Sequence, residues 1–225
     1  MDSKKNSVLK RDDKPYILIG AGGHAKVIVD ILSLEGKKIH GFFDDNKRNL
    51  KDLKYLGPID TIHKMPMVLK KNYYYIIAIG DCFLRYKLEQ TLGIPHESYG
   101  IAIHPTAVIS TDAKLLFGTV VMANVVINTD AKVGRQVILN TGSLIEHDTI
   151  IQDFVHISPG CCLAGGVKVG EGTHVGIGTQ SIQLIKIGSW SIIGAGSTIV
   201  SDIPDNVLAY GTPAKIMKEG INDEF

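Results

Sequence analysis

The sequence has few cysteines, almost no net charge and no long apolar run, and each of these absences excludes a class of protein. Cys82, Cys161 and Cys162 form no CxxC pair, and their odd number argues against a disulfide scaffold. A formal charge of +1, from 24 basic and 23 acidic residues, leaves no basic field for nucleic-acid binding. No apolar run reaches about eighteen residues, and the first residues lack the apolar segment of a signal peptide. We therefore expect a cytoplasmic protein with no membrane span.

What the sequence does contain is a six-residue repeat that runs without a slip from Ile103 to Ile199. Every sixth residue is a branched aliphatic except Ser181, and a second series, two residues earlier in each repeat, is almost entirely small or β-branched. Neither a helix, with a period of about 3.6 residues, nor one alternating strand, with a period of about 2, produces this pattern. A hexapeptide solenoid does, with both series pointing into a narrow shared core.

Each hexapeptide corresponds to one short strand and one corner, so three make a triangular coil and the repeat holds about five coils. Glycines directly follow the inward aliphatic residue at Gly134, Gly170, Gly176, Gly188 and Gly194. We expect those positions to be corners that need a positive φ. This stretch resembles the left-handed parallel β-helix of the hexapeptide acyltransferases, and its handedness is implied by that resemblance alone.

A smaller α/β unit precedes the solenoid. Apolar runs over residues 16–19, 39–43 and 73–79 predict buried parallel strands. Helical spacing predicts a helix over 26–34 and another with Leu84, Leu88 and Leu92 on one face and Arg85 on another. The stretch between about 47 and 67 is only weakly patterned.

The first strand ends in the sequence Gly20-Ala21-Gly22-Gly23-His24-Ala25, which resembles the dinucleotide-binding fingerprint. Such a loop turns tightly and offers free N–H groups at a helix start to a phosphate. Asp44 follows roughly twenty residues later, where an acid binds ribose hydroxyls. The unit is about half the size of a complete dinucleotide fold, so we expect it to hold one nucleotide diphosphate.

These patterns predict an α/β Rossmann-like half-domain followed by an all-β parallel β-helix. We expect a disordered tail over residues 1–14, a nucleotide-sugar-binding domain over 15–102, the β-helix over 103–203 and a C-terminal segment over 204–225. The sequence Gly211-Thr212-Pro213-Ala214-Lys215 in that last segment resembles the close of the hexapeptide family.

Side chains outside the two inward series face outward or lie at corners. His156 and His174 are one coil apart, so they should stack roughly 4.8 Å from each other. The stretch 140–148, continued by 154–158, resembles the branch of hexapeptide enzymes that acetylates amino groups on nucleotide-linked sugars. Bacillosamine and perosamine biosynthesis use such enzymes, and the branch includes proteins labelled sialic-acid O-acetyltransferases.

This resemblance implies a role for each matching residue. It implies that His147 is the general base and that Asp148, where the family often has Glu, raises its basicity, with Glu146 as an alternative support. Acetyl-CoA is the implied co-substrate, with no metal, and its implied contacts are His156, Ile177, Gly194, Ala195 and Gly196. The implied nucleotide-sugar contacts are Gly22, Gly23, His24, Asp44, Asp45, Gly80 and Asn140. The family also implies a homotrimer with active sites between subunits.

The implied chemistry suits these residue types. A histidine with an ordinary pKa near 6.5 takes a proton from an attacking amine at neutral pH, and an N–H donor must then stabilise the thioester oxyanion. The resemblance implies an acetyl-CoA-dependent N-acetyltransferase acting on a nucleotide-activated amino sugar for cell-surface glycans, with a UDP-4-amino sugar as the first candidate. Three alternatives stay open: an O-acetyltransferase for sialic acid or a related sugar, a non-catalytic nucleotide-sugar sensor, and a zinc hydrase on the same fold with His156 and His174 as candidate ligands.

Overall fold

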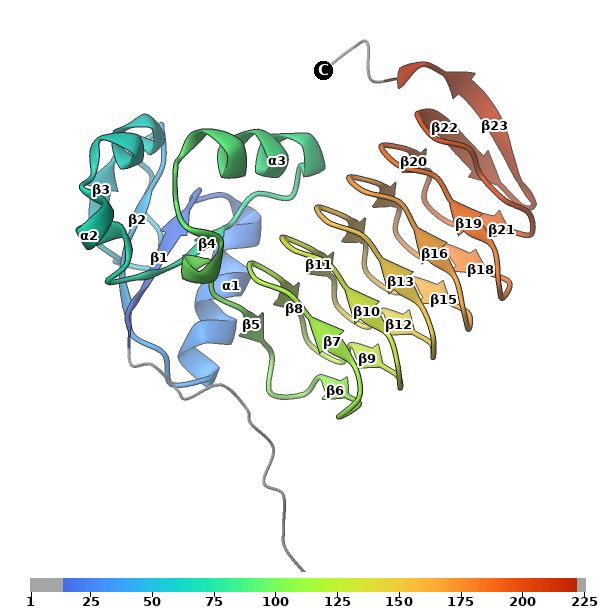
Figure 1. The fold of residues 1–225 in the computed structure, drawn as a ribbon, viewed down its shortest axis with the longest axis horizontal. Helices are drawn as coiled ribbons and strands as arrows, with labels where there is room; N and C mark the ends of the chain where they lie inside the picture. Colours follow the sequence, from blue (N-terminus) through green and yellow to red (C-terminus); the bar gives the residue numbers. More distant parts are fainter. Residues whose placement is uncertain (1–13, 222–225) are drawn as a thin grey trace, which may run out of the picture.

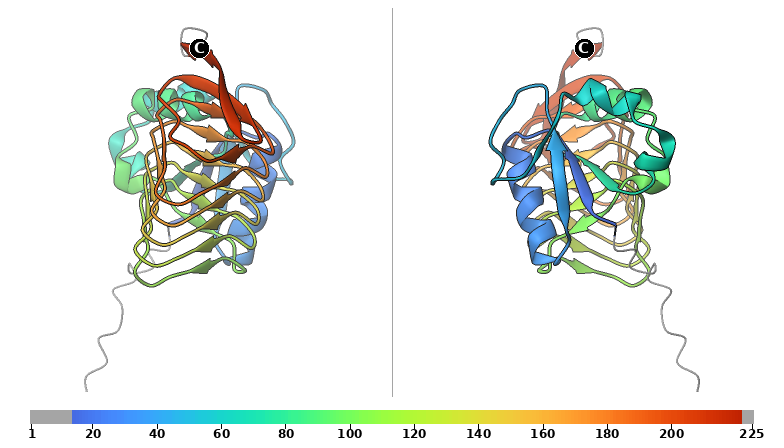
Figure 2. Two further views of the ribbon diagram at one scale, coloured as in Figure 1. Left: turned by 90° about the vertical axis from the view of Figure 1, so that its right-hand side faces the viewer. Right: turned by 90° about the vertical axis from the view of Figure 1, so that its left-hand side faces the viewer.

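The computed structural model of the chain describes residues 14–221, so the predicted N-terminal tail lies almost wholly outside the described residues. A small α/β unit is followed by a solenoid of parallel coils (Figure 1). Seen along the solenoid axis, the coils stack as a three-sided prism (Figure 2). None of the helices between residues 14 and 221 is long and apolar enough to cross a membrane.

The α/β unit is built on a four-stranded parallel sheet in the order β3-β2-β1-β4. Its strands are β1 (Tyr16–Ile19), β2 (Ile39–Phe43), β3 (Tyr55–Gly57) and β4 (Tyr74–Ile77). The first two strands are confirmed with their predicted bounds, and β4 is shorter than predicted. The third strand, β3, lies inside the weakly patterned stretch, where three residues are too few to display a period.

Alternate side chains of β1 serve two separate cores, as expected for a strand covered on both faces. Leu18 packs into the core that continues through α1 into the solenoid, while Ile17 packs into a second cluster with Ile62 and Leu92. The helices around the sheet are α1 (Gly23–Leu34), η1 (Ile59–Lys64), α2 (Met67–Lys70), α3 (Cys82–Thr91) and η2 (His96–Ser98).

The first helix, α1, begins three residues earlier than predicted. Gly22 is its N-cap, so Gly23 and His24 belong to the first turn. Glycine is a poor helix former, which is why the sequence pattern placed the start later, but N–H groups of a first turn need no intrahelical partner. The helix therefore starts directly behind the glycine loop and aims these free N–H groups at it.

The solenoid strands form three parallel sheets, one for each side of the prism. The five-stranded sheet contains β7 (Lys114–Leu115), β10 (Lys132–Val133), β13 (Ile150–Ile151), β16 (Lys168–Val169) and β19 (Lys186–Ile187). The six-stranded sheet contains β6 (Val108–Ile109), β9 (Val126–Ile127), β12 (Leu144–Ile145), β15 (Cys162–Leu163), β18 (Gln180–Ser181) and β21 (Thr198–Ile199). The eight-stranded sheet contains β5 (Ala102–Ile103), β8 (Val120–Val121), β11 (Ile138–Leu139), β14 (His156–Ile157), β17 (His174–Val175), β20 (Ile192–Ile193), β22 (Val207–Gly211) and β23 (Ala214–Glu219).

The predicted register is confirmed along the prism. Ile138 pairs with His156, and His156 pairs with His174, so residues eighteen apart lie side by side. From the second coil on, both inward series are buried except for Ser181, which is half-buried. The final hairpin of β22 and β23 closes the eight-stranded sheet, with Gly211 paired to Ala214 across its turn.

The prediction that glycines after the inward aliphatic residue need a positive φ is wrong. Gly134, Gly170, Gly176, Gly188 and Gly194 are absent from the positive-φ residues of the described chain. They are glycines because a neighbour, in most cases the backbone of the next coil, passes where a Cβ would lie. From Gly118 on, the left-handed corner comes three residues before each member of the six-residue series, as at Gly160 and Gly178 with φ of 66° and 69°.

The leucines of α3 do not form the face that packs against the solenoid. Leu84 is 40% exposed, whereas Arg85 is 1% exposed and Glu89 is 5% exposed. The leucine period suggests an ordinary apolar stripe, but the surface that α3 meets consists of solenoid corners with free carbonyl groups. Polar side chains therefore face inward on this helix.

Candidate functional site

The glycine loop, the end of β2 and the end of β4 together enclose a pocket of about 400 Å³. Carboxyl ends of parallel strands meet at one edge of a sheet, which is where such folds bind ligands. All six residues that were predicted in this domain line the pocket: Gly22, Gly23, His24, Asp44, Asp45 and Gly80. A larger hollow of about 830 Å³ on the five-stranded sheet contains none of the predicted site residues.

Asp44 shapes this pocket through its own hydrogen bonds. Its Oδ2 accepts from the N–H of Ala21 at 2.7 Å and its Oδ1 accepts from the N–H of Asn46 at 2.8 Å. The carboxylate thereby ties the glycine loop to the end of β2. Asp45 lies beside it, exposed, with Oδ1 accepting from the N–H of Ile59 at 2.9 Å. A ligand hydroxyl at Asp44 would have to share oxygens that the backbone already uses.

His156 joins the pocket to the solenoid. Its Nδ1 lies 3.2 Å from the carbonyl oxygen of Gly80, which only accepts, so Nδ1 carries the proton. Its Nε2 then accepts from Nδ2 of Asn140 at 3.1 Å. Gly80, His156 and Asn140 thus form one chain of hydrogen bonds from the pocket rim to a solenoid corner. A coenzyme hydrogen bond to Nε2 of His156 would compete with Asn140.

The predicted stacking of His156 on His174 is confirmed, with ring centroids 4.8 Å apart and planes 2° from parallel. Burial, the His174 ring and the Arg85 charge lower the pKa of His156 to about 3. Burial and Arg85 lower the pKa of His24 to about 4, and burial also lowers the pKa of His174. The three rings are therefore neutral at pH 7. Nε2 of His24 is buried without a hydrogen-bond partner in the described chain, which leaves it available to a ligand in the pocket.

These lowered pKa values predict that the free energy of unfolding falls as the pH drops from about 6.5 to about 4. In that window the unfolded chain binds protons at these histidines and the folded chain does not. Each such histidine therefore adds up to about 1.4 kcal/mol per pH unit to the change of the free energy of unfolding with pH. Denaturant titrations at pH 7, 6 and 5 measure the effect. We expect His156→Asn to make the free energy of unfolding depend less on pH, and the exposed control His63→Asn to leave this pH dependence unchanged. Equal free energies of unfolding of the wild type at pH 7 and pH 5 would contradict this prediction.

The predicted base and its acid occupy a different corner of the prism. Nδ1 of His147 lies 2.7 Å from Oδ2 of Asp148, and since a carboxylate only accepts, the remaining nitrogen, Nε2, is free to take a proton. The pKa of His147 is raised, chiefly by the hydrogen bond that its Nδ1 donates to Asp148. Desolvation acts in the opposite direction, and the charges of Asp148 and Glu146 raise the pKa further. Glu146 does not substitute for Asp148 here, because its Oε2 accepts from Asn128 at 2.9 Å.

The shorter acid suits this corner. Asp148 has a φ of 60°, and aspartate and asparagine tolerate the left-handed region better than glutamate does. The carboxylate of Asp148 thereby reaches the imidazole of the preceding residue directly. The side chains of His147 and Asp148 are 59% and 66% exposed, so the chain by itself leaves the pair in water.

The structure does not bring all predicted site residues together in one chain. His147 lies at the corner between the six-stranded and five-stranded sheets, after β12. Asn140, Ile177 and the Gly194–Gly196 turn lie at the corner between the eight-stranded and six-stranded sheets, after β11, β17 and β20. One whole side of the prism separates the predicted base from the predicted coenzyme contacts.

Three residues of these sites escaped the sequence analysis. Arg48 lines the pocket as an exposed cation suited to a phosphate, but nothing in its local pattern marks it. A Cβ on Gly165 would lie 2.6 Å from Nε2 of His147, so this glycine makes room for the imidazole. Only the stacking of corners eighteen residues apart reveals this contact. The third is Arg85, whose burial no apolar pattern indicates.

The chain is similar to known proteins in both sequence and structure. Residues 16–92 match the sequence profile described as the PglD N-terminal domain. The perosamine N-acetyltransferase from Caulobacter crescentus, solved in complex with CoA and GDP-perosamine, is 36% identical with a TM-score of 0.84, covering 91% of this chain and 97% of that one. The chain belongs to the hexapeptide-repeat sugar acetyltransferase family. Its solenoid is the left-handed parallel β-helix of that family.

Two further relatives are similar. The acetyltransferase domain of PglB from Neisseria gonorrhoeae, solved with acetyl coenzyme A, is 32% identical with a TM-score of 0.83, covering 91% of this chain and 99% of that one. The UDP-N-acetylbacillosamine N-acetyltransferase of Bacillus subtilis is 38% identical over 113 residues, which is 49% of this chain. That alignment spans 52%, about half, of the curated relative's length.

Proposed function

We propose that this protein transfers the acetyl group of acetyl-CoA to the amino group of a nucleotide-linked amino sugar, with a UDP-4-amino sugar as the first candidate. The observation that carries the proposal is the His147–Asp148 pair at 2.7 Å, in a chain that also holds a pocket at a glycine loop. Relatives solved with CoA and GDP-perosamine and with acetyl coenzyme A support the two substrate classes. The proposed setting is the biosynthesis of cell-surface glycans.

In the proposed reaction the neutral amine of the sugar attacks the thioester carbonyl. Nε2 of His147 takes the proton of the attacking nitrogen, while Asp148 holds the Nδ1 proton and stabilises the imidazolium. The tetrahedral intermediate then collapses to the amide, the C–S bond breaks, and His147 returns its proton to the CoA thiolate. The base must therefore be neutral at the start of each turnover.

We propose that Gly22, Gly23, His24, Asp44, Asp45 and Gly80 bind the nucleotide sugar and that Asn140 lies near its acceptor amine. Free N–H groups at the start of α1 and the cation of Arg48 suit a diphosphate. Ile177, which is 60% exposed, and the turn Gly194-Ala195-Gly196, which has no large side chains, form an apolar corner suited to the pantetheine of acetyl-CoA. His156 borders both ligands.

We also propose a homotrimer with the active site between copies. The corner stack that carries His147 continues through exposed apolar residues, Ile182 at 43%, Leu184 at 78% and Val200 at 46%. Leu184 has a φ of 62°, a strained conformation for a leucine that is 78% exposed within its own chain. A second chain against this corner would cover these side chains, exclude water from His147 and supply the coenzyme corner.

Three cysteines without a disulfide fit a reducing compartment, which supports the cytoplasm as the proposed location.

A thiol-release assay with acetyl-CoA tests the proposed reaction. The acceptors are UDP-, GDP- and dTDP-linked 4-amino sugars, with sialic acid as the hydroxyl acceptor and a nucleotide-linked sugar without an amine as the blank. We expect release with at least one amino sugar and none with the blank. Release with sialic acid alone would transfer the proposal to O-acetylation, and binding of nucleotide sugars without any release would favour a sensor.

The proposed mechanism predicts a shifted pH profile for Asp148→Asn. Because Asp148 raises the pKa of His147, the wild-type activity should fall on the acid side with a midpoint above about 6.5. Removing the carboxylate charge lowers that pKa, so the acid limb should move to lower pH while kcat at pH 8 drops about 10- to 100-fold. Asp130→Asn is the matched control, since Asp130 occupies the same left-handed corner position with a φ of 58°. An unshifted acid limb in Asp148→Asn would contradict the role of Asp148.

A further inference from the structure

The helix α3 connects the nucleotide pocket to the solenoid, and its side chains follow the solenoid corners in order. Phe83 lies against Trp190 with ring centroids 6.1 Å apart, and Tyr86 lies against Phe154 at 5.4 Å. One turn further, Oε1 of Glu89 accepts from Nε2 of Gln136 at 3.2 Å. Tyr86 also contacts Trp190 at 5.4 Å, so α3 runs along one corner stack of the prism from Trp190 to Gln136.

The corner residues beneath α3 are unusual for their conformation. Gln136, Phe154 and Trp190 have φ values of 55°, 61° and 53°, although bulky residues in the left-handed region cost about 1–2 kcal/mol each. Gly172 lies between two of them, and a Cβ there would overlap the ring of Trp190. The side chains that α3 contacts thus replace the glycine, asparagine or aspartate found at most other left-handed corners.

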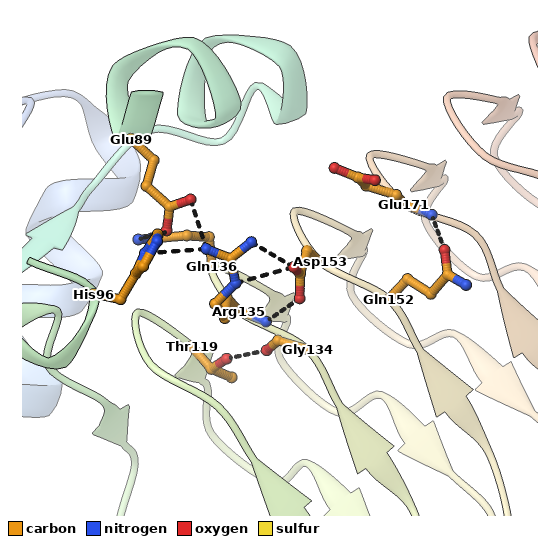
Figure 3. A network of polar contacts seen from close by, with 9 residues as sticks. All are labelled: Glu89, His96, Thr119, Gly134, Arg135, Gln136, Gln152, Asp153 and Glu171. Carbon is orange, nitrogen blue, oxygen red and sulfur yellow. Dashed lines mark hydrogen bonds and ion pairs between the residues drawn. The ribbon is translucent and has the colours of Figure 1, made fainter. Parts of the chain in front are cut away.

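A polar network fixes the far end of the helix (Figure 3). Oε2 of Glu89 accepts from Nη1 of Arg135 at 3.0 Å, and Nη2 of Arg135 donates to Asp153 at 2.7 Å. His96 lies 3.1 Å from the same guanidinium group. This network holds α3 and η2 on the corners of two coils, about two helical turns away from the pocket.

Arg85 fixes the near end of the helix, and it is 1% exposed. Nε donates to the carbonyl oxygen of Gln136 at 3.0 Å, and Nη2 donates to that of Phe154 at 2.6 Å. Nη1 donates to the carbonyl oxygens of Ile79 at 3.1 Å and Gly80 at 2.7 Å. Ile79 and Gly80 line the pocket, so one guanidinium group bridges the pocket rim and two solenoid corners.

The carbonyl oxygen of Gly80 is shared. It accepts from Nη1 of Arg85 at 2.7 Å and from Nδ1 of His156 at 3.2 Å. Arg85 has no carboxylate partner among the described salt bridges, and it remains charged because a guanidinium stays protonated in proteins. Its charge is stabilised by carbonyl dipoles, and such charge-assisted hydrogen bonds are about twice as strong as neutral ones.

We propose that Arg85 is a positioning residue for the proposed acetyl transfer. It holds the Ile79–Gly80 rim, and through Gly80 the neutral ring of His156, at a fixed place relative to the solenoid corners. The sugar amine is then presented at the height on the prism where the thioester lies. Arg85 is not among the residues that line the pocket, and the inference rests on the proposed function for its kinetic consequence only.

Arg85→Lys tests this role, because lysine keeps the charge but cannot bridge the rim and both corners. We expect kcat/KM for the nucleotide amino sugar to fall about 10- to 100-fold, as for a reactant misplaced by about 1 Å. Glu89→Gln is the matched control, since it weakens the same helix–solenoid contact without touching the pocket rim. Equal losses in both variants would reduce Arg85 to a general docking contact and overturn the proposal.

Hydrogen–deuterium exchange gives a readout that needs no turnover. In the wild type, a peptide covering residues 76–85 should exchange as slowly as the coil peptides around 136–139, and in Arg85→Lys it should exchange at least about tenfold faster, with Glu89→Gln unchanged there. Fast exchange of this peptide in the wild type would overturn the proposal even if the variant failed to fold. If the wild type acetylated no amino sugar, the proposed function would fail while this exchange comparison still decided the role of Arg85.

Discussion

We expect His147→Ala to lower kcat by about 10²- to 10⁴-fold, the range that a positioned general base contributes. Without the imidazole, the proton of the attacking amine has only water to go to, and the Asp148 carboxylate is one residue away from where the base acts. Burial plays no part in this loss, because the His147 side chain is 59% exposed and its removal opens no cavity in the chain. Acetyl-CoA binding should therefore survive.

Steady-state thiol release and calorimetric titration with acetyl-CoA measure the two effects separately. His63→Ala serves as the control, since His63 is an exposed histidine of η1, outside the pocket lining, and should retain wild-type kcat. A His147→Ala enzyme with kcat within about threefold of the wild type would move the base elsewhere, and His156 would be the next residue to replace.

The second large effect concerns the stability of the solenoid. We expect Gly170→Ala to destabilise the fold by about 3 kcal/mol or more, because an added Cβ would lie 2.7 Å from the carbonyl carbon of Gly188 in the next coil. Backbone atoms of stacked coils do not move aside as flexible side chains do. The new methyl group would have to push two coils apart where strands lie about 4.8 Å from each other.

Gly160→Ala is the matched comparison. Gly160 has a φ of 66° and no atom within 4 Å of an added Cβ, so alanine there meets only the cost of the left-handed conformation, about 1–2 kcal/mol. Thermal and denaturant unfolding should rank the wild type first, Gly160→Ala second and Gly170→Ala last. A reversed order of the two variants would show that left-handed corners, and not close coil contacts, decide which positions require glycine.

Much of the solenoid could be predicted because its pattern is local and repeated. An aliphatic residue at every sixth position indicates where each strand lies, which of its faces is buried and how successive coils pair. The stacking of coils then places His156 beside His174. The corner glycines were misassigned for a physical reason. A close backbone approach and a positive φ both select glycine, and only the spacing between coils distinguishes the two causes.

The α/β unit was less predictable because its informative contacts are distant in sequence. Leu84 follows a helical period but is 40% exposed, and Arg85 is buried against carbonyls of residues 136 and 154. The sequence around these two residues does not indicate which parts of the fold they contact. For the candidate site, the resemblance identified the residues that line the pocket, while the arrangement of His147 and Ile177 on different corners required the fold.

That separation leads to the most direct test of an active site built from two copies of the chain. Two variants are co-expressed: His147→Ala, which lacks the base, and Ile177→Arg, which blocks the proposed coenzyme corner. Each should be inactive when expressed alone. When equal amounts of the two variants assemble at random, about a third of the sites in each mixed trimer, and about a quarter of all sites, pair an intact base with an intact coenzyme corner. We predict recovery of up to about a quarter of wild-type thiol release with a UDP-4-amino sugar. Mixed trimers, verified by native mass spectrometry, that remain as inactive as the separate variants would contradict the account.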